Sequence, residues 1–193
     1  MERDYQPLPV YELGDGAGFH RPIQSQAERV GVDSPALHVM TDLTRTSPAT
    51  IRPQAPLAGA NEFMITRGVR LLLVADDREK VLGVITATDL LGEHPVQVAV
   101  GRGMRRDELT VADVMIDAAQ VDVLRLADVE SARVGHVLET LRRSGRQHAL
   151  VVDAAGAVRG IFSVSQIARQ LGVTLAAAGE VARTFAQIEA VIR

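Results

Sequence analysis

The chain has 193 residues, of which 47% are hydrophobic and 23% are charged, and its formal net charge is −3. That composition is typical of a globular protein and does not supply the basic face that a nucleic-acid-binding protein normally carries. The absence of cysteine excludes disulfides and cysteine-bound zinc and fits a reducing compartment. Because neither an apolar run long enough to cross a membrane nor a secretory signal is found, we expect a cytoplasmic protein that binds neither nucleic acid nor membrane.

An N-terminal arm is expected over residues 1–33, where prolines and glycines discourage long helices and strands. An internal repeat follows it. Gly83 and Gly160 lie 77 positions apart (160 − 83), and the same offset relates Asp76 to Asp153 without a gap. Such a repeat indicates two copies of one small structural unit.

The first copy has the pattern of a strand, a helix, a hairpin and a second helix. Its expected elements are a lead strand at 49–52, a helix from Leu57 with apolar residues at helical spacing, strands at 71–75 and 81–86, and a helix that begins near Thr86. Gly68 stands where a left-handed helix cap is needed, and the polar residues 76–80 form the hairpin turn.

The second copy follows a linker at 93–109 and repeats this order. Its expected elements are a lead strand at 121–126, a helix with Val134, Val137, Leu138 and Leu141 on one face, strands at 149–152 and 158–162, and a helix that begins near Ser163. Gly145 is the equivalent cap. We therefore predict an α/β protein with two repeats of the order β-α-β-β-α, at 34–92 and 110–172, packed sheet to sheet as a pseudo-two-fold pair because neither can bury both faces of its sheet alone.

The tail at 173–193 is predicted to be an amphipathic helix. Its apolar stripe comprises Leu175, Ala178, Val181, Phe185, Ile188 and Ile192. Such a stripe must be covered, and both the chain's own core and a partner subunit remain open as the covering surface.

The ordered motifs of the two copies resemble a tandem pair of cystathionine β-synthase (CBS) domains, also called a Bateman module. The residues that carry the resemblance in the first copy are Val39-Met40-Thr41, Thr50-Ile51-Arg52-Pro53, Gly68-Val69 and Gly83-Val84-Ile85-Thr86-Ala87-Thr88-Asp89. The resemblance implies a regulatory, dimerising module that binds adenosine-containing ligands between the repeats. No catalytic domain is visible, so an effector would act in trans.

The family's binding signature falls on Gly83, Thr86 and Asp89. The start of a helix offers backbone N–H groups to a phosphate, Thr86 can add a hydroxyl, and the carboxylate of Asp89 can accept bonds from both ribose hydroxyls. The same Thr86–Asp89 spacing is also that of a capping box, which needs no ligand. Ser163 is the equivalent hydroxyl in the second copy, but it is followed by Gln166, which lacks the paired anionic acceptor of a carboxylate. We expect a capping box there, and if only one cleft is occupied, it should be the one lined by Asp89.

Further candidate ligand contacts follow from the resemblance. They are Thr50, Ile51 and Arg52, where the lead strand usually holds the adenine, and Val69 and Arg70, at the start of the first hairpin. The five histidines are scattered and no metal-ligand spacing is present, so we expect no metal and no required cofactor. His148 is expected to be a partly buried packing residue.

Two functions are therefore compared. The first is a non-catalytic sensor of AMP, ADP, ATP, S-adenosylmethionine or a cyclic dinucleotide, which forms a homodimer and acts on a protein partner in trans. The alternative is a ligand-free dimerisation or interaction scaffold. No nucleophile, base or metal set suggests an enzyme.

Overall fold

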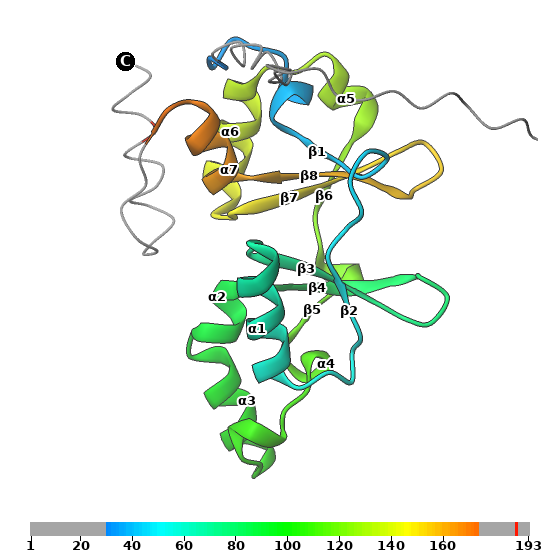
Figure 1. Cartoon of the computed structure of the whole chain (residues 1–193), viewed down its shortest axis with the longest axis vertical. Coiled ribbons are helices and arrows are strands. Elements are labelled where there is room, and N and C mark those ends of the chain that lie inside the picture. The colour runs from blue at the N-terminus through cyan, green and yellow to red at the C-terminus, as the bar shows by residue number, and fades with distance from the viewer. Residues whose placement is uncertain (1–29, 174–187, 189–193) are drawn as a thin grey trace, which may run out of the picture.

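The computed structural model describes residues 30–173 and Ile188. Most of the predicted N-terminal arm lies outside the described residues, and so does the predicted C-terminal helix apart from Val173 and Ile188. In the described part, two α/β units lie one above the other, each with a four-stranded sheet and its own helices (Figure 1). The helices of that part include none long and apolar enough to span a membrane.

The first unit contains the sheet with strand order β2-β3-β4-β5. Its strands are β2 (Thr50–Ile51), β3 (Leu71–Ala75), β4 (Val81–Thr86) and β5 (Ile116–Asp117), and its helices are α1 (Leu57–Arg67), α2 (Ala87–Leu91), α3 (His94–Arg102) and α4 (Val111–Val114). The predicted lead strand, hairpin and flanking helices are all present. Gly68 ends α1 in the left-handed conformation with φ 64°, as predicted. The predicted linker contains one full helix, α3.

The second unit repeats the arrangement, with strand order β1-β8-β7-β6. Its strands are β1 (Thr41–Asp42), β6 (Val123–Arg125), β7 (His148–Val152) and β8 (Val158–Ser163), and its helices are α5 (Leu126–Glu130), α6 (Val134–Ser144) and α7 (Val164–Gln170). Gly145 caps α6 with φ 65°, the counterpart of Gly68. The predicted order β-α-β-β-α is therefore confirmed in both units, with α5 added in the second.

Each unit takes its outer antiparallel strand from the beginning of the other repeat. β1 pairs with β8, although it lies at the start of the predicted first repeat, and β5 pairs with β4, although it lies at the start of the predicted second. The 3₁₀ turn at Ala36–Val39 and Met40 accordingly lie in the core of the second unit, with Val39 fully buried. The exchanged strands β1 and β5 are each the edge strand of their sheet, so the exchange links the two units at one edge of each sheet.

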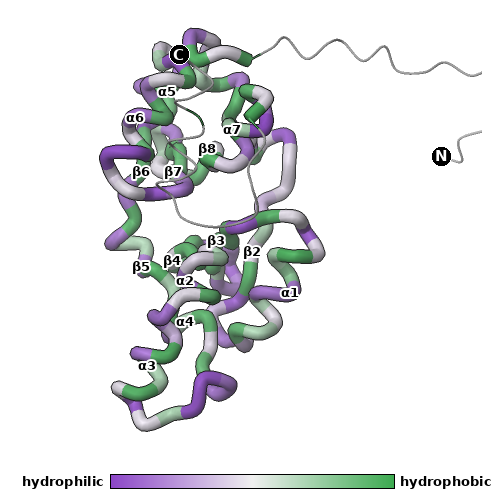
Figure 2. Tube along the Cα trace, turned by 90° about the vertical axis from the view of Figure 1, so that its left-hand side faces the viewer, coloured by the Kyte–Doolittle hydropathy of each residue, from purple (hydrophilic) through white to green (hydrophobic). Residues whose placement is uncertain are grey.

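The two sheets face each other through a shared apolar layer, as predicted. Successive side chains of a strand point to opposite faces, so Leu72 and Val74 pack under the helices of the first unit while Leu71 and Leu73 face the second unit. Leu150 of β7 meets them from the opposite sheet. Figure 2 shows the strands β3 and β4, coloured as hydrophobic, on the side of the first unit that is nearer the second.

Candidate functional site

Two cavities lie between the units, and both are lined by residues of each unit. The first cleft, of about 230 Å³, combines the start of α2 with the lead-strand segment and the α6–β7 corner of the second unit. Its lining residues that can make polar or charged contacts are Thr86, Thr88, Asp89, Asp122, Thr140, Ser144, Arg146, Gln147 and His148. Its walls are apolar, formed by residues such as Leu71, Val84, Ile116 and Leu150.

The second cleft, of about 910 Å³, is the pseudo-symmetric counterpart of the first. It combines the start of α7 with residues 46–49 and the α1–β3 corner of the first unit. Adding the repeat offset of 77 converts Gly68, Val69 and Arg70 of this cleft into Gly145, Arg146 and Gln147 of the first. The repeat found in the sequence therefore relates the two cavities residue by residue.

In the first cleft, Thr86 and Asp89 form a complete capping box at the start of α2. The backbone N–H and the hydroxyl of Thr86 both donate to Asp89 Oδ2, at 2.8 and 2.7 Å, and the N–H of Asp89 donates back to Thr86 Oγ1 at 3.3 Å. Among the described residues no hydrogen bond reaches Asp89 Oδ1. The box therefore fixes the carboxylate by one oxygen and leaves the other as an acceptor.

The backbone at this helix start is more occupied than the sequence suggested. The N–H of Ala87 donates to the carbonyl oxygen of Arg70 at 2.9 Å, and the N–H of Asp89 is used in the capping box. These two N–H groups are therefore already paired, one with the residue that precedes β3 and one within the capping box. Ligand contacts at this end of α2 must come mainly from side chains.

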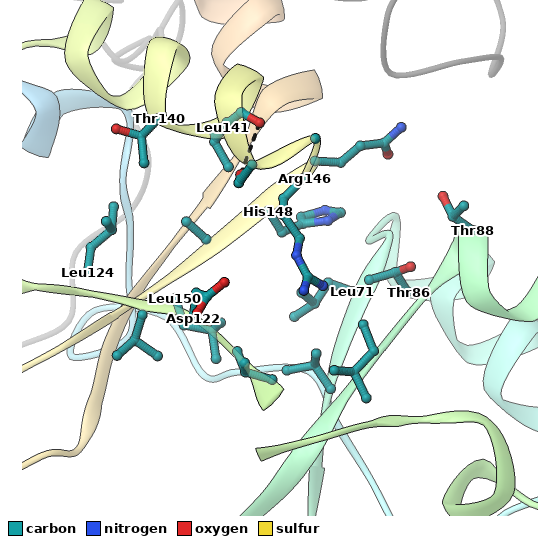
Figure 3. Close-up of a pocket in the computed structure, with 18 of the residues that line it drawn as sticks. Leu71, Thr86, Thr88, Asp122, Leu124, Thr140, Leu141, Arg146, His148 and Leu150 are labelled. Carbon is teal, nitrogen blue, oxygen red and sulfur yellow. Dashed lines mark hydrogen bonds between the residues drawn. The ribbon is translucent and has the colours of Figure 1, made fainter. Parts of the chain in front are cut away.

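Arg146, Thr88 and Asp122 join Thr86 in the first cleft without having been predicted as ligand contacts. Figure 3 shows the side chain of Arg146 extending from the second unit across the cavity, with Thr86 and Thr88 on one side and Asp122 on another. The repeat itself carried the signal for Arg146, because subtracting the offset of 77 gives the predicted contact Val69.

The predicted ligand contacts are divided between the two clefts. Thr86 and Asp89 line the first, and the second is lined by Val69, Arg70 and Ser163. The four other predicted contacts line neither cavity: Gly83, Thr50, Ile51 and Arg52.

Two of these four have other partners in the structure. Arg52 donates to the carbonyl oxygen of Ala75 at 3.2 Å and forms an ion pair with Asp77 at 3.1 Å, so its guanidinium braces the first hairpin. The space beside Gly83 is filled by the backbone of β5, because a Cβ atom at Gly83 would lie 2.3 Å from the carbonyl oxygen of Ile116.

The capping box predicted for Ser163 and Gln166 is wrong. Ser163 Oγ lies 3.0 Å from Ser165 Oγ, and no side-chain hydrogen bond caps α7. Gln166 instead accepts a hydrogen bond at Oε1 from the hydroxyl of Thr41, at 3.0 Å. The exchanged strand β1 brings Thr41 beside α7, and that tertiary contact replaces the local one.

His148 and Leu71 line both clefts and occupy equivalent positions of the two repeats, since 148 − 77 is 71. His148 is partly buried, as predicted. Burial lowers its pKa to about 4, and the positive charge of Arg70 acts in the same direction. The imidazole is therefore neutral at neutral pH and separates the two cavities without adding charge to either.

No group of three or more His, Asp or Glu side chains that could hold a metal occurs within residues 30–173.

Comparison with known proteins agrees with this architecture. Residues 39–95 match the CBS domain family, whereas no curated protein matches the chain. Among solved structures, an uncharacterised conserved protein from Pyrococcus horikoshii is 20% identical with a TM-score of 0.56, and the match covers 77% of this chain and 100% of that one.

Two further similar structures contain adenosine compounds. CBSX2 from Arabidopsis thaliana, in complex with AMP, is 23% identical with a TM-score of 0.52, over 70% of this chain and 94% of its own. The CBS domain pair of protein MJ0100, in complex with 5′-methylthioadenosine and S-adenosyl-L-methionine, is 20% identical with a TM-score of 0.50. The match covers 70% of this chain and 98% of that one. Residues 39–95 thus match the CBS domain family, and the chain has the fold of a tandem CBS-domain pair.

Proposed function

We propose that this protein is a regulatory module that binds an adenosine-containing ligand in the first cleft. The observation that carries the proposal is the convergence of Asp89, Thr88 and Arg146 on one cavity built from both units. The AMP bound to CBSX2 and the two adenosine compounds bound to protein MJ0100 support this ligand class.

Each part of the cleft suits one part of such a ligand. The carboxylate of Asp89, held by the capping box, accepts hydrogen bonds from ribose hydroxyls. Arg146 and the hydroxyl of Thr88 are donors for a phosphate or carboxylate group. Leu71, Val84 and the other apolar walls accommodate the flat face of the adenine.

The size of the cleft requires a movement on binding. Its volume of about 230 Å³ lies below the roughly 300–1,000 Å³ of typical ligand sites. Arg146, which extends across it, is an exposed side chain and can change rotamer at low cost. In the proposed complex Arg146 moves aside and then closes on the anionic end of the ligand.

Regulation follows from the position of the cleft between the units. A ligand there changes the relative free energies of arrangements that hold the units at different distances, by its difference in affinity for them. The protein would form a homodimer, pass this change to a protein partner in trans, and catalyse no reaction itself.

The experiment that tests the proposal is calorimetric titration of the full chain with AMP, ADP, ATP, S-adenosylmethionine and 5′-methylthioadenosine. Asp89→Asn should weaken binding of the active ligand roughly tenfold or more, because hydrogen bonds to a charged group contribute about 1.5–3 kcal/mol. The matched control is Asp113→Asn. Asp113 forms the same capping box with Thr110, at 2.8 and 2.7 Å, but lines neither cleft. Equal affinity of Asp89→Asn and the wild type would exclude the assignment.

The alternative, a ligand-free scaffold, has one observation in its favour. The Thr86–Asp89 capping box is complete without a ligand, so these residues need none to explain their presence. Titrations that show no binding by any of the five compounds would favour the scaffold.

A further inference from the structure

The second cleft differs from the first in charge. Arg67, Arg70 and Arg169 line it, and no Asp or Glu is found among its described lining residues. The first cleft, by contrast, contains Asp89 and Asp122 against the single cation of Arg146. The pseudo-two-fold repeat has thus produced two cavities of similar construction and opposite electrostatic character.

The three arginines of the second cleft are not neutralised by carboxylates within the described part of the chain. Arg67 lies over the ring of Phe63, with 5.6 Å from its guanidinium carbon to the ring centroid. Arg169 has a long contact of 3.4 Å to the carbonyl oxygen of Ser165. Neither of them, nor Arg70, forms an ion pair there, whereas Arg52, Arg102 and Arg159 do.

The remaining polar groups of the second cleft supply further hydrogen-bond donors, and the carboxylate acceptor found in the first cleft has no counterpart among them. Hydroxyl groups line it from both units, those of Thr41, Thr46, Ser47, Ser163 and Ser165. Gln166 stands in the position of Asp89, and its Oε1 is already occupied by the hydroxyl of Thr41. Its amide NH₂ group is the part left for a ligand, and that group donates hydrogen bonds.

We infer that the second cleft binds an anion carrying two or more linked phosphate groups. Arg70, Arg169 and the surrounding hydroxyls would contact the phosphates, and recognition would not require a ribose. Guanidinium groups suit phosphate oxygens because their N–H donors match them in pairs. A cavity of about 910 Å³ has room for a chain of phosphates, and for a nucleoside attached to it that makes no specific contact. The inference extends the proposed ligand-binding role to a second site but does not rest on adenosine binding in the first cleft.

The test is calorimetric titration of the full chain with sodium tripolyphosphate, pyrophosphate and orthophosphate. We expect affinity to fall in that order, and to fall further as the ionic strength rises, because the site is partly open to solvent. Arg70→Gln and Arg169→Gln should each weaken tripolyphosphate binding roughly tenfold or more. Arg70→Lys should retain part of the affinity, since it keeps the charge and loses the paired donors.

The control is an arginine outside both clefts. Arg102→Gln should leave tripolyphosphate binding unchanged, because Arg102 lines neither cavity. Failure of the adenosine proposal is measured with the adenosine compounds and Asp89→Asn, so the two failures are separate results. Loss of binding in Arg146→Gln with full binding in Arg70→Gln would overturn the inference, and so would absence of tripolyphosphate binding to the wild type.

ATP and adenosine distinguish the sources of the phosphate chain. Equal affinities of ATP and tripolyphosphate, with no competition by adenosine, would support recognition of the phosphates alone. Displacement of tripolyphosphate by adenosine would contradict it, because adenosine carries no phosphate.

Discussion

Gly83 and Gly160 are equivalent residues of the two repeats, and each lies against the strand that its sheet receives from elsewhere in the chain. What a side chain would meet differs between them. A Cβ atom at Gly83 would lie 2.3 Å from the backbone carbonyl oxygen of Ile116, whereas one at Gly160 would lie 2.4 Å from Sδ of Met40. The first contact is with backbone that is fixed in a sheet, and the second is with the flexible end of a side chain.

This difference predicts unequal costs for the same substitution. Gly83→Ala should lower the free energy of unfolding by about 1–3 kcal/mol, as overpacking does when the neighbour cannot move. Gly160→Ala should cost less, because Met40 can change rotamer. Urea unfolding measures both.

A control for the alanine itself is Gly101→Ala, because a Cβ at Gly101, within α3, would meet no atom within 4 Å. That variant should be as stable as the wild type or gain up to about 1 kcal/mol from helix propensity. A larger loss for Gly160→Ala than for Gly83→Ala would show that β5 yields more readily than Met40.

At the scale of elements, the exchanged segments each contribute core residues to the unit that is formed mainly by the other repeat. Segment 36–42 contributes to the second unit and segment 111–117 to the first. Val39 is fully buried in the second unit, and Val114 is 1% exposed in the first. Removing methyl groups from either should destabilise the chain by about 2 kcal/mol.

The two substitutions should act on different sheets, which hydrogen exchange read by mass spectrometry can resolve. Val39→Ala should reduce protection in β7 and β8 more than in β3 and β4, because local opening follows the unit that has lost contacts. Val114→Ala should show the reverse pattern, and the two variants control for each other. Equal loss of protection in both sheets would mean that the pair opens as one cooperative body.

The sequence predicted the elements of each repeat because their signals are local. Helical spacing, the caps at Gly68 and Gly145 and the hairpin turns depend on neighbouring residues only. The strands β1 and β5 have two residues each, and their partners are chosen by tertiary packing, so no local signal predicted them. The same contact of β1 explains the failed capping box at Ser163.

The candidate site could be predicted only in part for a related reason. The Thr86–Asp89 pair is a local motif, and the structure places it in a cavity. Which corner of the other unit faces it depends on the pseudo-two-fold packing, and that packing sends Arg146 to the first cleft and Arg70 to the second. One repeat read alone therefore combines residues that lie in two different cavities.

At the scale of the whole molecule, the question is whether the apolar stripe predicted beyond α7 packs against its own chain or against a partner. Ile188 is 1% exposed and lies in the core of the second unit with Phe162 and Val173. This residue of the predicted apolar stripe therefore packs within its own chain. A scaffold that assembles through this stripe would need the same side chain at an interface between chains.

Ile188→Ala distinguishes these roles. If Ile188 belongs to the core, the substitution should lower the free energy of unfolding by about 2–5 kcal/mol and leave the mass measured by light scattering unchanged. The comparison variant is Ile65→Ala on α1, where the same side chain is 72% exposed and its loss should change the unfolding free energy of the chain by no more than about 0.5 kcal/mol. A smaller assembly with unaltered stability of each chain in Ile188→Ala would instead place this residue between subunits, and the ligand-free scaffold would then gain the interface that it lacks.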